Sequence, residues 1–382
     1  MYNTLLEPIT QDVAYTWLCK QRKHFPASSD VWHFRAHYPE QRPALVQSLA
    51  NGSYRFAPMN QVRLKEKTVH VWPAQEALVL KMLSLSVFKH LDAAKEISLN
   101  AYHIQNNGGI KRAINRVQAK INDYPFVFNT DVKGFYENIQ HDALMETLST
   151  VIPDTRILDL IEQSVRRSVT GGGLYRDIKK GIPRGSSLSP LLGALVLRDL
   201  DIAMSRIKGI YYCRYMDDWT VLCPTRGKLR HVIKTTHKVL NRLALTLHPD
   251  KTYLGKTAKG FEFLGYHFMP KEEQTENESP PGQPPAPSSP TTDAPPQSKG
   301  GLQVAKPTMM RALTKLLQLY EQGKPIEACR LYWQRFTRWA LSKIENKRAI
   351  FEQLSKIELL LYTTKLQKEI RHEIFNRFNA CG

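Results

Sequence analysis

The chain of 382 residues has 54 Lys and Arg against 35 Asp and Glu, a formal net charge of +19, and a hydrophobic fraction of 42%. This length suits two or three domains with a sizeable core. The basic excess points to a polyanionic partner, foremost a nucleic acid; a basic protein that is only soluble, or that binds membrane surfaces, is the alternative.

The sequence disfavours a membrane-spanning protein, a secreted protein and a zinc-binding or disulfide-linked protein. No apolar run approaches the roughly 20 residues that span a bilayer, and Met1–Glu7 lacks the basic start and apolar core of a signal peptide. The five cysteines are scattered, without a Cys-x-x-Cys pair. This pattern predicts reduced thiols in a cytoplasmic protein and no zinc site.

Helices and strands are expected to alternate over residues 1 to about 270, which predicts an α+β protein. Tyr54–Trp72 alternates as a pair of strands does, around a Lys65-Glu66-Lys67 turn. Gln75–Leu91 predicts a buried helix. Phe126–Thr130 is aromatic and β-branched and predicts a strand, with Asp131 at its end. An acid at such a place is often only a cap for a following helix.

A loop rich in Gly, Pro and Ser follows at Gly181–Pro190, before an apolar helix predicted over Leu191–Leu200. A helix N-terminus that exposes backbone N–H groups and hydroxyls is suited to bind phosphate or a template backbone. The same residues could also form only a loop and a cap.

Two adjacent acids lie between two β-prone segments, Ile210–Cys213 and Trp219–Leu222. The pattern predicts a hairpin with Asp217 and Asp218 at its tip. Adjacent carboxylates repel each other unless a cation lies between them, and oxygen ligands favour a hard metal. A solvated Asp-Asp turn is the alternative. Cys213, before this turn, is expected to be a buried small hydrophobe rather than half of a disulfide.

The remaining chain divides into three parts. In the first part, up to about residue 270, Lys251 is expected in a turn before a strand, and Phe261–Tyr266 predicts a pair of apolar strands broken by Gly265. Residues 271–300 are polar and Pro-rich, which predicts a disordered linker. Residues 301–382 predict basic helices, the third over Ala349–Phe378. A nucleic-acid-binding subdomain is favoured over a plain bundle.

This order of motifs resembles the palm of a reverse transcriptase, an RNA-directed DNA polymerase, in the bacterial group II intron-like branch. The resemblance implies a right-hand polymerase fold with fingers, an antiparallel-sheet palm and a helical thumb. It places an N-terminal region and fingers at 1–125 and the palm at 126–270, with a fingers insertion at about 145–180. The linker at 271–300 and the thumb at 301–382 follow.

The resemblance also implies roles for individual residues. The catalytic carboxylates would be Asp131, Asp217 and Asp218, holding two Mg²⁺ or Mn²⁺ ions together with the backbone carbonyl of Val132. Nucleotide contacts are expected at Arg63, Lys65, Phe135, Tyr136, Arg184, Gly185 and Lys251, with Tyr136 as the gate against a ribose 2′-hydroxyl. Template or primer contacts are expected at Ser186, Ser189, Tyr215, Met216, Gly265, Arg335 and Arg338.

The chain departs from the family pattern in its second palm motif. The family usually has Gln at the position of Arg184 and Pro at that of Ser187. A guanidinium would bind phosphate more strongly and read base-pair geometry less well. The Arg-bearing stretch that the family has after its first fingers helix is also replaced, around Ser98–Gly109.

The expected function is RNA-templated DNA synthesis by two-metal-ion nucleotidyl transfer. Its partners would be an RNA template, a DNA or RNA primer and dNTPs, with an associated non-coding RNA or accessory protein as further candidates and no membrane. The alternatives are an RNA-binding, maturase-like protein with a vestigial site, and an RNA-templated RNA polymerase. Intron mobility, retron-like synthesis, mutagenesis, antiviral defence and CRISPR-linked roles stay open as biological settings.

Overall fold

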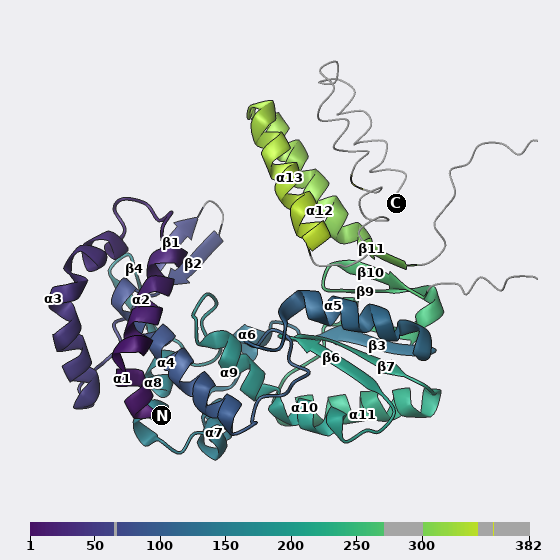
Figure 1. Ribbon diagram of the computed structural model, residues 1–382, viewed down its shortest axis with the longest axis horizontal. Helices are drawn as coiled ribbons and strands as arrows, with labels where there is room; N and C mark the ends of the chain where they lie inside the picture. The colour runs from purple at the N-terminus through teal and green to yellow at the C-terminus, as the bar shows by residue number, and fades with distance from the viewer. Residues whose placement is uncertain (65–66, 271–300, 343–353, 355–382) are drawn as a thin grey trace, which may run out of the picture.

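The computed structural model describes residues 1–64, 67–270, 301–342 and 354 (Figure 1). Helices surround three small sheets in this part of the chain, with the strand orders β2-β1-β4-β5, β6-β7-β3-β8 and β11-β10-β9. The predicted α+β class is therefore confirmed. None of the helices in these ranges has both the length and the apolar character needed to cross a membrane.

The first sheet lies at one end of the molecule, among the N-terminal helices (Figure 1). Its elements are α1 (Tyr2–Leu6), α2 (Pro8–Gln21), α3 (Asp30–Ala50), β1 (Met59–Leu64), β2 (Lys67–Val71), α4 (Ala74–Ala93), β4 (Ser168–Gly171) and β5 (Leu174–Asp177). The predicted strand pair and buried helix are confirmed as β1, β2 and α4. Strand β4 pairs parallel with β1, so a segment about 110 residues further along the chain completes this sheet.

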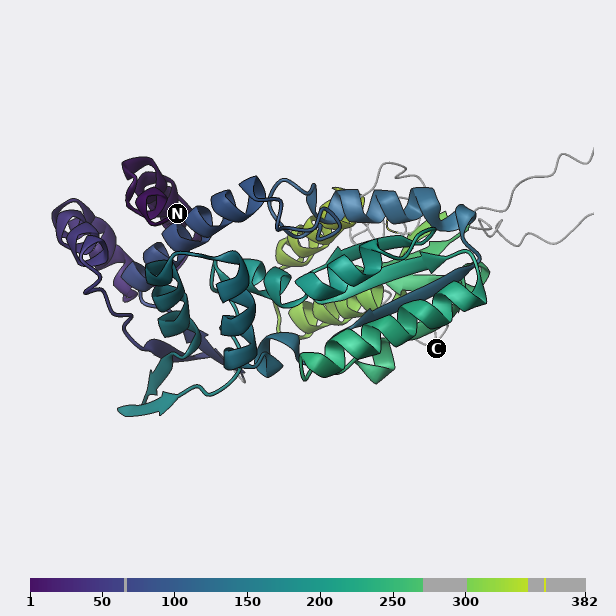
Figure 2. The same cartoon turned by 90° about the horizontal axis from the view of Figure 1, so that it is seen from below.

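The second sheet is antiparallel throughout. It consists of β3 (Phe126–Asp131), β6 (Tyr211–Tyr215), β7 (Asp218–Cys223) and β8 (Tyr253–Lys256). Helix α5 (Gly109–Lys120) covers one face, and α10 (Arg198–Ser205) and α11 (Arg226–Arg242) cover the other (Figures 1 and 2).

Because side chains alternate across a strand, Val127 packs into the core on the α5 side and Phe128 into the core on the α11 side. The same alternation places Cys213 and Cys223 on opposite faces, both buried and free.

The third sheet supports two helices that project from it (Figure 1). Its strands are β9 (Phe261–Phe263), β10 (Tyr266–Met269) and β11 (Gly301–Val304), and the helices are α12 (Lys306–Glu321) and α13 (Ile326–Ser342). The predicted break at Gly265 is a two-residue turn in which Leu264 and Gly265 have φ angles of 50° and 85°, as a type I′ turn requires. Trp339 of α13 stacks on Tyr266 at 5.6 Å between ring centroids, which docks the helices on the sheet.

Two sequence predictions fall outside the described residues: the Pro-rich linker at 271–300 and the helix over Ala349–Phe378. The strands on either side of the linker, β10 and β11, are paired antiparallel with Tyr266 opposite Val304. The Pro-rich segment therefore joins two neighbouring strands of one sheet.

Short helices connect the first and second sheets. They are α6 (Phe135–Asn138), α7 (His141–Val151), α8 (Thr155–Val165) and α9 (Ser189–Val196). The apolar helix predicted over Leu191–Leu200 begins two residues earlier, at Ser189, and ends at Val196. Leu197 follows with a φ of −93° and a ψ of 11°, and a separate helix, α10, begins at Arg198.

Candidate active site

Three carboxylates gather at one end of the second sheet. Asp131 ends β3, Asp218 begins β7, and the two are directly opposite each other in the antiparallel register. Tyr215 pairs with Asp218 in the hairpin, so Met216 and Asp217 form the tip. The predicted hairpin and the predicted strand end are both confirmed, and the sheet brings together acids that are 86 residues apart in the sequence.

Burial and mutual repulsion raise the pKa values of two of these acids. For Asp217, burial is the larger cause and the charge of Asp131 adds to it. For Asp218, burial comes first again, followed by the charges of Asp131 and Asp217, and together they raise its pKa to about 7. The site therefore disfavours three simultaneous negative charges unless a cation is present.

Part of the required positive charge comes from Lys251, whose ammonium donates a hydrogen bond to Asp131 Oδ2. This bond is the main cause of the raised pKa of Lys251. Asp131 Oδ1 is buried and has no partner. The sequence placed Lys251 in a turn and the family resemblance listed it as a nucleotide contact; the structure places its ammonium against Asp131, a predicted metal ligand.

The carboxylate oxygens of Asp131, Asp217 and Asp218 are ligands of the kind that hard cations prefer, but the three side chains do not converge on a single position. Within the described ranges, no group of three or more His, Cys, Asp or Glu side chains is close enough to hold a metal ion. The unpartnered Asp131 Oδ1 and the repulsion at Asp218 nevertheless leave oxygen ligands that a divalent cation would satisfy. Next to Asp131, the hydrogen bonds of the Val132–Leu247 bridge are made by Lys133 N–H and His248 N–H, so the Val132 carbonyl lies outside this ladder.

The turn before the acids is held in a strained conformation. Met216 has a φ of 58°, in the left-handed region that side chains other than glycine rarely adopt. Its N–H donates to His103 Nδ1 at 2.9 Å, and its carbonyl accepts from Arg214 Nη1 at 2.8 Å. Both polar groups of the strained residue are therefore bonded, which offsets a conformational cost of about 1–2 kcal/mol.

Arg214 is fully buried, with a side chain 0% exposed, against Asp201, which is 4% exposed. The guanidinium donates two bonds to Asp201, one of them from Nε at 2.8 Å, and the hydroxyl of Tyr212 donates to the same carboxylate at 2.7 Å. Burial disfavours the charge on Arg214, but Asp201 more than offsets it, so its pKa is raised. Removing one partner of such a pair costs about 3–5 kcal/mol.

His103 is neutral because burial, followed by the charge of Arg214, lowers its pKa to about 3. Since Nδ1 accepts the Met216 N–H, the proton lies on Nε2, which is 3.3 Å from the carbonyl of Pro190. The ring therefore links the acidic turn to the start of α9. Sequence reasoning missed His103 and Arg214; the only signal was their position, in the atypical Ser98–Gly109 stretch and two residues before Met216.

The two aromatic residues that follow Asp131, Phe135 and Tyr136, differ in burial and in what they contact. Phe135 is buried in the core. Tyr136 is half-buried, its hydroxyl lies 3.8 Å from Met216 Sδ, and burial, followed by the charge of Asp217, raises its pKa to about 12. Gly193 of α9 makes room for both rings, because a Cβ there would lie 3.0 Å from the ring of Phe135 and 3.7 Å from the Tyr136 hydroxyl.

The loop at Gly181–Pro190 is attached to the backbone of α6. Gly181 N–H donates to the Ile139 carbonyl at 2.7 Å and Ile182 N–H donates to the Tyr136 carbonyl at 2.8 Å. Ser189 is buried and its hydroxyl donates to the Pro183 carbonyl at 2.6 Å, while the buried Ser186 hydroxyl accepts the Leu188 N–H at 3.3 Å. These hydroxyls hold the loop in shape, so the geometry does not support the predicted template contact at Ser189.

A cleft of about 1000 Å³ lies between this loop and β2. Four residues predicted to contact nucleotide or template line it: Tyr136, Arg184, Gly185 and Ser186. The Arg184 side chain is 67% exposed and pairs with Glu137 at 3.2 Å. An exposed pair of this kind contributes about 0–1 kcal/mol, so Arg184 is easily released to another anion.

Other predicted contacts lie elsewhere. Gly265 lies beneath the helices, where its Cβ would be 3.3 Å from Thr308 and 3.4 Å from Trp339; its helix contacts and turn geometry explain it without nucleic acid. Arg335 and Arg338 are exposed on α13. Tyr215 is half-buried and packs edge-on against His103 at 5.9 Å between ring centroids. Lys65 and the side chain of Arg63 lie outside the described residues.

Comparison with known proteins connects this geometry to a family. The family profile described as "Reverse transcriptase (RNA-dependent DNA polymerase)" matches residues 73–268, just over half of the 382 residues. The chain is similar to protein YkfC of Escherichia coli, with 22% identity over 316 residues that cover 70% of this chain and 83% of YkfC.

Two further relatives are proteins named for introns. The COX1/OXI3 intron 1 protein of Saccharomyces cerevisiae is 23% identical over 284 residues, covering 59% of this chain and 34% of that protein. The group II intron-encoded protein LtrA of Lactococcus lactis is 21% identical over 175 residues, covering 44% of this chain and 29% of LtrA. The chain thus matches most of YkfC and about a third of the two intron proteins.

The loop geometry predicts unequal effects of two alanine substitutions. Gly181 and Gly185 both have a φ of 83°, but a Cβ on Gly181 would lie 2.8 Å from the Glu137 carbonyl, whereas Gly185 faces open space. Gly185→Ala should cost only the conformational strain, about 1 kcal/mol, and Gly181→Ala about 3 kcal/mol or more. Urea denaturation of the two variants measures this difference, and equal losses would contradict the close packing of the loop on α6.

The raised pKa of Asp218 predicts a pH-dependent stability. Because the folded state holds this proton more tightly than the unfolded state, the contribution of Asp218 to the free energy of unfolding falls as pH rises from about 4 to 7. Asp218→Asn removes this loss, so at pH 8 without divalent cations the variant should melt roughly 2–6 °C above the wild type. At pH 4.5 the melting temperatures of the wild type and the variant should converge. A difference that does not change with pH would show that the raised pKa of Asp218 is not its cause. Added Mg²⁺ should raise the melting temperature of the wild type more than that of the variant.

Proposed function

Because the chain belongs to the reverse transcriptase (RNA-dependent DNA polymerase) family and is distantly related to the group II intron-encoded protein LtrA, we propose that it copies RNA into DNA by nucleotidyl transfer at Asp131, Asp217 and Asp218. A single observation carries the proposal: the strand register sets Asp131 opposite Asp218, beside a turn clamped through Met216. A vestigial site would have no reason to retain three acids that repel one another.

The proposed architecture is a right hand. The β2-β1-β4-β5 sheet with its helices would be the fingers, the β6-β7-β3-β8 sheet the palm, and α12 with α13 the thumb. The pairing of β1 with β4 supports a fingers insertion at about 145–180, because that segment returns to the first sheet. The docking of Trp339 on Tyr266 supports a thumb that is based on the third sheet.

Reverse transcriptases typically use divalent metal ions, and this chain offers oxygen ligands for them. Asp131, Asp217 and Asp218 would hold the ions, with the Val132 carbonyl as a further donor. Mg²⁺ or Mn²⁺ bound there would lower the pKa of the primer hydroxyl and stabilise the leaving pyrophosphate. Lys251 is the residue that would have to leave Asp131 as the site fills, since its ammonium now occupies Oδ2.

The cleft next to the acids would receive the incoming nucleotide and template base. Arg184 would exchange Glu137 for phosphate, because its exposed ion pair is weak. Tyr136 lies between the acids and the cleft, where its ring would meet the sugar. Phe135, buried behind it, would support the ring rather than touch substrate.

Two other functions make distinguishable predictions. A maturase-like RNA-binding protein with a vestigial site would bind RNA without incorporating nucleotides. An RNA-templated RNA polymerase would accept UTP as readily as dTTP. The position of Tyr136 favours DNA synthesis over RNA synthesis, because a bulky ring beside the sugar excludes a 2′-hydroxyl sterically.

The central test is primer extension on poly(rA)/oligo(dT) with dTTP or UTP. The wild type should incorporate dTTP, and Asp217→Ala should reduce the rate at least about 100-fold, the scale on which enzymes respond to the loss of one transition-state contact. A melting temperature of the variant at or above that of the wild type would exclude misfolding, because the substitution removes one of the repelling acids. Absence of incorporation by the wild type, or an unchanged rate in the variant, would disprove the proposal.

The gate has its own test. Tyr136→Ala should lower the preference for dTTP over UTP by about 10-fold or more, because one lost steric contact in a pocket is worth roughly 1–3 kcal/mol. Tyr136→Phe retains the ring and should retain the preference. The measurement is kcat/KM for dTTP and for UTP with the wild type and both variants. If Tyr136→Ala prefers dTTP over UTP as strongly as the wild type does, Tyr136 is not the gate.

A further inference from the structure

Helix α11, on the outer face of the second sheet, contains six cations and no acid. Four of them recur at every fourth position and are exposed, namely Arg226, Arg230, Lys234 and Lys238. Arg242 continues the series and pairs with Asp199. Among the described residues, no ion pair reaches the other four. An exposed stripe of charge about 18 Å long therefore runs along the helix.

This stripe works against the stability of the helix that carries it. Like charges at i and i+4 destabilise a helix by about 0.2–0.5 kcal/mol per pair, and the series from Arg226 to Arg242 contains four such pairs. Arg226 also stands at the positive end of the helix dipole, where acids are favoured. Solubility alone is better served by mixed charges. The uncompensated series is therefore suited to an external polyanion.

A groove of about 540 Å³ extends the stripe onto the edge of the sheet. Arg226 and Arg230 line it from α11, and Lys256 and Lys259 line it from β8 and the turn that follows. Between these cations lie Phe126, with the Arg226 guanidinium 5.9 Å from its ring centroid, and Leu254, which is 49% exposed. Four cations thus surround a partly apolar floor. The cations could bind phosphates of a nucleic acid, while the apolar side chains between them contact its sugars or bases.

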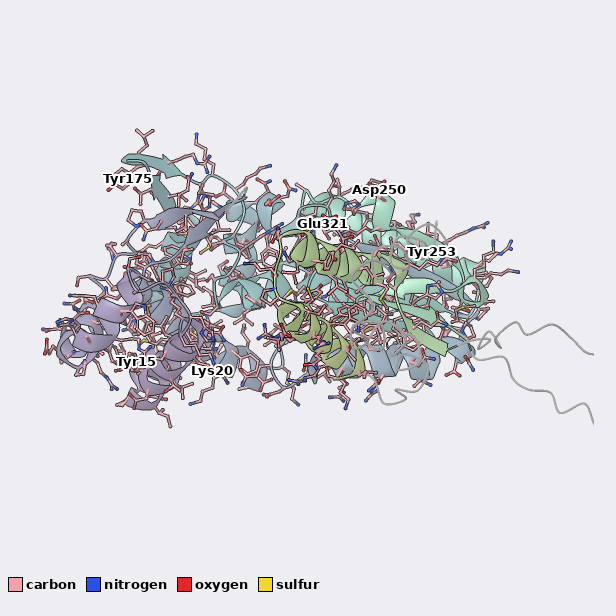
Figure 3. The ribbon with its side chains drawn as sticks, turned by 90° about the horizontal axis from the view of Figure 1, so that it is seen from above. Tyr15, Lys20, Tyr175, Asp250, Tyr253 and Glu321 are labelled. Carbon is pink, nitrogen blue, oxygen red and sulfur yellow. The ribbon has the colours of Figure 1, made fainter. Side chains whose placement is uncertain are left out.

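We propose that α11 and the edge strand β8 form a second nucleic-acid-binding surface, which holds the phosphate backbone of RNA away from the catalytic acids. The choice of RNA rests on the proposed function, which brings an RNA template to this protein. Phe126 and Asp131 stand at opposite ends of β3, so the end of the groove at Phe126 and Lys256 lies about 17 Å from the acids along the strand, whereas Tyr253 at its other end pairs with Asn129. Tyr253, at the start of β8, is at the end of the molecule remote from Tyr15 and Lys20 (Figure 3).

The proposed surface on α11 and β8 also lies apart from the basic helices α12 and α13. Helices α12 and α13 rise from the third sheet, whereas α11 covers the opposite side of the second sheet (Figure 1). An RNA bound to α11 would therefore leave the proposed path between palm and thumb free. Such a site would retain a structured part of an RNA while another part is copied.

The test reverses two charges with R230E/K234E and uses a fluorescent 20-base-pair RNA hairpin as the probe. Affinity by anisotropy should fall at least about tenfold at 100 mM salt, and the slope of log K against log salt should become shallower by about 2. The melting temperature should stay the same or rise slightly, because the new acids face Arg226 and Lys238 at i, i+4 spacing. The matched control R230K/K234R keeps both charges and should bind like wild type.

Two further measurements separate this surface from the active site. Extension of a short primer–template by R230E/K234E should stay within about twofold of wild type, since neither residue touches the catalytic site. If the wild type extended no primer at all, the binding experiment would still decide the surface. The inference is overturned if R230E/K234E binds the hairpin as wild type does, if R230K/K234R loses affinity equally, or if anionic vesicles bind these residues and RNA does not.

Discussion

Repulsion among three carboxylates is the constraint on which the rest of this structure depends. Asp131, Asp217 and Asp218 lie near one another at the end of a sheet that is covered on both faces, where burial and mutual charge raise the pKa values of the last two. A hairpin in water would separate such groups. Here the antiparallel register, the cores on both faces and the Lys251 ammonium hold them together. A divalent cation bound to these oxygens would relieve the repulsion.

The clamp around Met216 shows how the surrounding protein maintains that arrangement. A left-handed residue other than glycine persists only where its neighbours dictate it. His103 and Arg214 do so from opposite sides of Met216, and each is tied to a different element: His103 to the start of α9 and Arg214 to Asp201 of α10. The acidic turn is therefore fixed relative to the same helix that orders the Gly181–Pro190 loop. The His103 ring thus connects the two walls of the proposed nucleotide site.

The distribution of positive charge follows from this acidic centre. A polymerase must attract a polyanion to a site that is itself negative, so cations are needed around the acids rather than among them. Lys251 neutralises Asp131, Arg184 waits on a weak pair with Glu137, and the stripe on α11 is displaced from the site altogether. Part of the positive charge thus neutralises an acid of the site, and part is free for the proposed contacts with nucleotide and RNA.

The sequence by itself predicted the strands that carry the acids and the family to which the chain belongs. Alternation and turn residues predicted the strand ending at Asp131 and the hairpin at Asp217, and the order of motifs predicted the family, because these signals are local and survive without knowledge of the partner strand. Only the tertiary structure decided which groups meet. The register that opposes Asp131 and Asp218, the His103 bridge and the bond of Lys251 to Asp131 join residues 87 or more positions apart. Pairing over such separations depends on the closure of the whole sheet, which no local pattern encodes.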